Sequence, residues 1–153
     1  MRIFPWQKKK DFFSHEENQQ LVDAIQKAEH QTSGEVRIFV ESKCKYVDAL
    51  DRAQEIFFSL KMNETELRNG TLIYVAVKDK QAAVFGDEGI HEKVGAKYWK
   101  DVVTKMLFQF RHEKLADGIC QGIYELGEAL KFYFPYHSDT DKNELPDEIV
   151  FGR

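Results

Sequence analysis

Several features that mark particular protein classes are scarce or missing in this chain of 153 residues. Its two cysteines, Cys44 and Cys120, lack the spacing of a disulfide framework or a zinc site and are typical of free thiols. The net charge of −4 excludes the basic surface of a nucleic-acid-binding protein. No apolar run reaches the roughly 20 residues that span a bilayer, and the N-terminus lacks the apolar core of a signal peptide. We therefore expect a soluble, cytoplasmic protein with no nucleic-acid partner and no transmembrane segment.

Proline is also scarce, occurring only at Pro5, Pro135 and Pro146. Because proline interrupts helices and central strands, its absence from the interior favours one continuous domain with long helices. We expect this domain over residues 12–136, after an N-terminal extension at 1–11 and before a C-terminal tail at 137–153. The apolar fraction of 42% is sufficient for the core of one domain of this length.

Apolar residues at helical spacing predict four helices, over about 14–31, 47–62, 91–108 and 115–133. The first begins with Ser14 and Glu17, a pattern in which each side chain satisfies a free backbone N–H at the start of the helix. Alternating β-branched residues predict a strand at 35–41. The almost fully apolar run at 71–77 is typical of a central strand, and residues 81–85 return antiparallel to it.

The order of these elements predicts a three-layer α/β/α sandwich with a short mixed twisted sheet and helices on both faces. A right-handed crossover makes the first two strands parallel. Because three strands form a narrow sheet, residues 148–151 are a candidate for a fourth strand.

These strand directions bring three loops, at 33–35, 68–70 and 86–89, to one edge of the predicted sheet. The loops carry the carboxylates of Glu35, Asp87 and Glu88 and the amide of Asn69. Calcium prefers about 6–8 oxygen ligands of these types, so the edge is a candidate cation site, with magnesium as an alternative ion. The same residues are also common in plain turns, and an aspartate before a helix is often only a cap.

Four motifs follow one another along the predicted domain: Thr32-Ser33-Gly34-Glu35-Val36-Arg37, Asn69-Gly70-Thr71-Leu72-Ile73, Gly86-Asp87-Glu88-Gly89-Ile90 and Ala116-Asp117-Gly118-Ile119. Together with Trp99 and Phe110, they resemble the TPM domain family of photosystem II repair proteins and many bacterial proteins, over about residues 12–134. The resemblance implies an α/β/α sandwich with a loop cluster that binds calcium in some members. It also implies weak acid phosphatase activity, known from a plant member. The residues that match the cluster are Glu35, Asn69, Asp87 and Glu88, with Asp117 as a further candidate.

Two other groups of residues are weak candidates for metal sites. The segment from Asp139 to Asn143 begins like an EF-hand loop but has Glu144 and Val150 where that loop requires glycine and glutamate. The histidines have no spacing typical of a metal site, although His91 follows the loop at 86–89.

Three hypotheses for function remain. The first is a TPM-like domain that binds a divalent cation through Glu35, Asn69, Asp87 and Glu88, with little or no catalysis. The second is a metal-assisted phosphatase on phosphomonoesters, in which Arg37 or Arg68 assists. The third is an interaction module for an unknown protein partner. In that case the aromatic N-terminus of this chain, or the apolar end of its tail at 149–151, contacts the partner.

Overall fold

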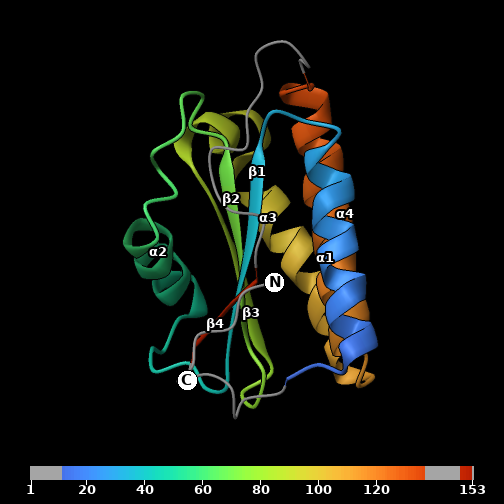
Figure 1. Cartoon of the computed structure of the whole chain (residues 1–153). Helices are drawn as coiled ribbons and strands as arrows, with labels where there is room; N and C mark the ends of the chain where they lie inside the picture. The colour runs from blue at the N-terminus through green and yellow to red at the C-terminus, as the bar shows by residue number, and fades with distance from the viewer. Residues whose placement is uncertain (1–11, 137–148, 153) are drawn as a thin grey trace.

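A four-stranded mixed sheet separates one helix from three others in the computed structural model, which describes residues 12–136 and 149–152 (Figure 1). Its elements are α1 (His15–Glu29), β1 (Glu35–Glu41), α2 (Ala49–Ser59), β2 (Gly70–Ala76), β3 (Gln81–Gly86), α3 (Glu88–Arg111), α4 (Leu115–Tyr133) and β4 (Ile149–Phe151). Helix α2 covers one face of the sheet, and α1, α3 and α4 cover the other. The predicted α/β/α sandwich is confirmed.

The strands lie in the order β3-β2-β1-β4. Strand β1 is parallel to β2 and β4, and β3 is antiparallel to β2, so the expected parallel pair and antiparallel return are confirmed. Every residue of β2 is buried, as its apolar sequence predicts for a central strand. The candidate fourth strand forms β4 at Ile149–Phe151. The predicted extension at 1–11 and the acidic segment at 139–144 lie outside the described residues.

Side-chain alternation along β2 divides the core in two. Leu72 and Tyr74 pack toward α2, whereas Ile73 and Val75 pack toward the three-helix layer. None of the described helices combines the length and apolar character that a membrane-spanning helix requires.

The helices begin where the sequence provides caps. The Ser14 hydroxyl accepts a hydrogen bond from the Glu17 backbone N–H (3.1 Å), and the Glu17 carboxylate accepts one from Ser14 N–H (2.9 Å), which confirms the predicted capping box. Helix α3 begins at Glu88 rather than the expected 91, because Asp87 directly follows β3 and caps the helix. Gly95, with φ of 80°, then kinks α3. The sequence did not predict this kink, because Gly95 stands within a run of residues at helical spacing.

A buried carboxylate ties α2 to the sheet. Both Glu41 oxygens accept hydrogen bonds of 3.0 Å from the Arg52 guanidinium, and one of them also accepts a hydrogen bond from the Tyr74 hydroxyl. Burial, followed by the hydrogen bond to Glu41, raises the pKa of Tyr74 far above its usual range. The raised pKa keeps the Tyr74 hydroxyl protonated, so that it donates its hydrogen bond to Glu41.

The two cysteines are free thiols, as predicted. Burial, with a smaller contribution from the charge of Asp117, raises the pKa of Cys120 to about 11. In a Cys44→Ser variant, we expect Cys120 to react with a disulfide reagent at pH 8 roughly a hundredfold more slowly than a small exposed thiol. Its rate should continue to rise up to about pH 11. The rate in urea is the control, and a fast reaction in the folded state would contradict the expectation.

Candidate functional site

Backbone hydrogen bonds join three separate loops at one edge of the sheet. Glu35 N–H donates to the Asn69 carbonyl (3.4 Å), Asp87 N–H to the Gly70 carbonyl (2.9 Å) and Gly89 N–H to the Arg68 carbonyl (2.8 Å). In the strand registers, Glu35 is opposite Gly70, and Thr71 is opposite Gly86. The predicted convergence of the loops is confirmed, and residues 33–35, 68–70 and 86–89 are called the three-loop rim below.

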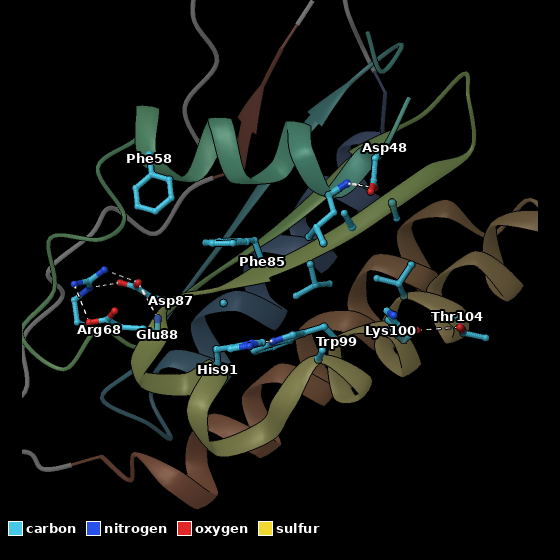
Figure 2. A pocket seen from close by; sticks show the side chains of 17 residues that line it. Asp48, Phe58, Arg68, Phe85, Asp87, Glu88, His91, Trp99, Lys100 and Thr104 are labelled. Carbon is cyan, nitrogen blue, oxygen red and sulfur yellow. Dashed lines mark hydrogen bonds and ion pairs between the residues drawn. The ribbon is translucent and has the colours of Figure 1, made fainter. Parts of the chain in front are cut away.

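Arg68 occupies the acidic part of this rim (Figure 2). Its Nε and Nη2 donate to the two carboxylate oxygens of Asp87 at 2.7 and 2.9 Å, and its Nη1 donates to Glu88 at 3.2 Å. The hydrogen bonds to Asp87 are the main cause of a raised pKa of Arg68. A guanidinium with paired hydrogen bonds thus lies where the sequence predicts a metal ion.

Asp87 has a structural role as well as the ion pair. Its side chain is 3% exposed, and one oxygen accepts a hydrogen bond from Glu88 N–H (2.8 Å) at the start of α3. The sequence left open whether Asp87 caps a helix or belongs to an acidic site. In the structure, Asp87 does both. Glu88, in contrast, exposes about two thirds of its side chain.

Asn69 is the least satisfied polar residue of the rim. It is 1% exposed, and neither its Oδ1 nor its Nδ2 has a hydrogen-bond partner among the described residues. Such a buried amide costs free energy unless a further ligand satisfies it. Asn69 also stands between Arg68 and Gly70, whose carbonyls both bind the loop at 86–89.

Glu35 lies at the same rim but not beside Asp87. Strand β2 separates β1 from β3, so the two backbones are about 10 Å apart at this edge. Glu35 is buried, and its carbonyl accepts a hydrogen bond from the Thr71 hydroxyl (3.2 Å). Over residues 12–136 and 149–152, no group of three or more histidine, cysteine, aspartate or glutamate residues is arranged to hold a metal ion.

Asp117 lies at the opposite end of the molecule. It is in the first turn of α4, where its carboxylate accepts a hydrogen bond of 3.0 Å from the Gln20 amide of α1. Helix α3 leads away from the rim and α4 returns antiparallel, so the start of α4 is far from the rim (Figure 1). The structure does not bring this predicted ligand to the others.

A groove that the sequence did not predict begins at the rim and follows β3 between α2 and α3 (Figure 2). Its volume is about 660 Å³, and its walls are mainly apolar. His91 lies in this groove, where its Nδ1 accepts a hydrogen bond from Trp99 Nε1 (2.9 Å). Since Nδ1 accepts, a neutral His91 carries its proton on Nε2. No sequence motif signals the groove, because two helices and one strand build it together.

Comparisons with known proteins agree with this architecture. A family model described as the TPM domain matches residues 7–129. The BA42 protein of the psychrophilic bacterium Bizionia argentinensis, whose NMR structure is known, is 41% identical, with a TM-score of 0.84 over 94% of this chain and 97% of that chain. No curated protein gave a match.

Two more distant NMR structures share the fold. One is the N-terminal domain of a protein from P. gingivalis, with 12% identity and a TM-score of 0.69 over 90% of this chain and 99% of that chain. The other is the N-terminal domain of the cg2496 protein from Corynebacterium glutamicum, with 11% identity and a TM-score of 0.59 over 92% of this chain and 82% of that chain. The fold and the three-loop rim define an α/β sandwich domain. The chain belongs to the TPM domain family.

Proposed function

We propose that this domain binds a divalent cation, calcium in the first place, at the three-loop rim in exchange for the guanidinium of Arg68. The observation that carries the proposal is the buried Asn69 side chain, which has no hydrogen-bond partner among the described residues. It lies beside an arginine that forms ion pairs with two carboxylates. A cation at the rim would gain the Asn69 side-chain oxygen as a ligand. The Arg68 guanidinium makes no hydrogen bond to this oxygen.

Asp87 and Glu88 supply carboxylate oxygens to this site, Asn69 supplies its amide oxygen, and water completes the shell that calcium requires. Glu35 is not needed, because β2 separates it from Asp87. Since the ion must displace an arginine with paired hydrogen bonds, we expect weak binding, with Kd on the order of 0.1–1 mM. The bound ion would neutralise the rim and hold the start of α3 against the loop at 68–70.

Calorimetric titration with calcium tests this exchange. In an Arg68→Met variant, which removes the competing charge and keeps the apolar stem, we expect about tenfold tighter binding than in the wild type. Asp87→Asn should abolish measurable binding but retain the fold, because asparagine also caps helices. Arg111→Met is the matched control, since Arg111 is exposed at the far end of α3.

Two results of the titration would refute the proposal: equal affinity of the wild type and Arg68→Met, or unchanged calcium binding in Asp87→Asn. Titration with magnesium identifies the preferred ion. Magnesium requires a stricter octahedral shell and releases its water reluctantly, so a flexible rim should favour calcium.

Catalysis on phosphomonoesters stays a prediction from the sequence. Of the two arginines considered for it, Arg68 is engaged by Asp87 and Glu88, and Arg37 is only 4% exposed within β1. These positions favour a binding role of the rim over a catalytic one.

A further inference from the structure

Strand β3 is an edge strand that lacks the residues that usually prevent an edge from pairing with another chain. Among the described strands it pairs only with β2, so the backbone N–H and C=O groups on its other side have no strand partner. Its sequence Gln81–Gly86 contains no proline and no charged residue. Natural proteins usually protect a free edge with such residues or a bulge, because it otherwise pairs with another chain.

The groove beside β3 has the dimensions and walls of a binding site for a strand. Helix α2 contributes Leu50 and Phe58, which are 43% and 44% exposed, and α3 contributes Trp99 and Val103. The small side chains of Ala82, Ala83 and Ala96 leave space between these walls. Figure 2 shows Phe58 and Phe85 on one side of the groove and Trp99 on the other.

The shape of the groove along β3 limits which kind of partner can bind in it. An incoming strand beside β3 would have apolar surface on both faces, since α2 and α3 both line the groove. It therefore needs apolar side chains at consecutive positions, as in a central strand. The β3 edge of a second copy would carry its own α2 and α3 on both sides, so the helices of the two copies would collide. A single extended segment avoids this collision.

The charges that line the groove indicate which charged residue the bound segment carries. Its charged lining consists of two cations, Arg68 and Lys100, and three carboxylates, Asp48, Asp87 and Glu88, so one negative charge remains. Glu88 is the most exposed part of the ion-paired cluster at the rim. A lysine or arginine that flanks the apolar segment would complement this charge.

We propose that the groove along β3 binds an extended segment of another protein that pairs with the β3 edge as a fifth strand. The segment has about five consecutive apolar residues, nearly the length of the six-residue strand β3, and a flanking basic residue. Main-chain hydrogen bonds to β3 provide affinity, and the walls from α2 and α3 select apolar side chains. The β3 edge and the apolar walls of this site lie apart from the cation ligands, although Arg68, Asp87 and Glu88 of the rim line one end of the groove.

A synthetic fluorescent peptide, Lys-Gly-Val-Ile-Val-Phe-Val-Gly-Lys with blocked ends, tests the proposal. We expect saturable binding in fluorescence anisotropy and amide NMR shifts concentrated at residues 81–86. The same peptide N-methylated on its five core amides keeps its side chains but cannot donate to β3. It should bind at least about tenfold more weakly.

A pair of variants provides the matched control. Ala96→Trp places a large side chain in the groove at an exposed helix position and should weaken binding about tenfold. Lys97→Trp places the same side chain one residue further on, at a position that does not line the groove. Its affinity should match that of the wild type.

Three results would overturn the proposal. The first is equal binding of the methylated and unmethylated peptides, and the second is no binding of the unmethylated peptide. The third is self-association of the protein that shifts the same residues 81–86, because the occupant would then be a second copy.

Discussion

Replacement of Gly89 by alanine is expected to destabilise the domain by about 3 kcal/mol, because an added Cβ would overlap the backbone of the rim. That atom would lie 2.2 Å from the Leu67 carbonyl oxygen and 2.6 Å from the Arg68 carbonyl oxygen. Backbone atoms cannot move aside as a flexible side chain can. The hydrogen bond from Gly89 N–H to the Arg68 carbonyl would also lengthen. Urea unfolding followed by circular dichroism measures the loss of stability.

Glu92→Ala is the control for this variant, since Glu92 is exposed on the same part of α3 and its replacement should change stability by less than about 0.5 kcal/mol. Because Gly89→Ala separates the loops at 68–70 and 86–89, it should also weaken calcium binding at the rim. Wild-type stability of Gly89→Ala would show that the two loops are not packed as described.

Replacement of Glu41 by alanine is expected to destabilise the domain by about 3 kcal/mol, because it removes the buried carboxylate of a partly buried ion pair. Arg52 would lose both of its hydrogen bonds to Glu41, and the buried Tyr74 hydroxyl would lose its acceptor. The free energy of unfolding in urea measures this effect. A slope of the denaturation curve equal to that of the wild type would show that the variant exposes the same amount of surface on unfolding.

Replacement of Glu55, the second carboxylate that pairs with Arg52, is a matched control for Glu41→Ala. Glu55 also accepts a hydrogen bond from Arg52, but its side chain is 48% exposed. Glu55→Ala should therefore cost less than about 1 kcal/mol. Similar losses in Glu41→Ala and Glu55→Ala would contradict the assignment of Glu41 as the stabilising partner.

The part of the rim that depends on strand direction was predictable from the sequence. The apolar run at 71–77 and the turn after it determine one antiparallel return, and the crossover from 35–41 determines one parallel pair. These two relations bring Asn69 and Asp87 to the same edge, as the structure has them. Backbone pairing is a property of whole segments, so it leaves a clear signal in the sequence.

Side-chain pairing within the rim was not predictable in the same way. Arg68 is next to Asn69 in sequence, but only its left-handed backbone, with φ of 52°, and the approach of α3 bring its guanidinium to Asp87. Asp117 was assigned to the cluster by family resemblance, whereas the direction of α4 places it at the other end. The β3 groove has no local signal because its walls come from separate helices.

A crystal structure of the protein with bound calcium would show directly whether a cation replaces Arg68 at the rim. We expect one ion at the rim, about 2.3–2.6 Å from oxygens of Asp87, Glu88 and Asn69, as calcium coordination requires. We also expect that the Arg68 guanidinium has left Asp87 and points to solvent. An ion elsewhere, or Arg68 still 2.7 and 2.9 Å from the Asp87 carboxylate at saturating calcium, would contradict this exchange.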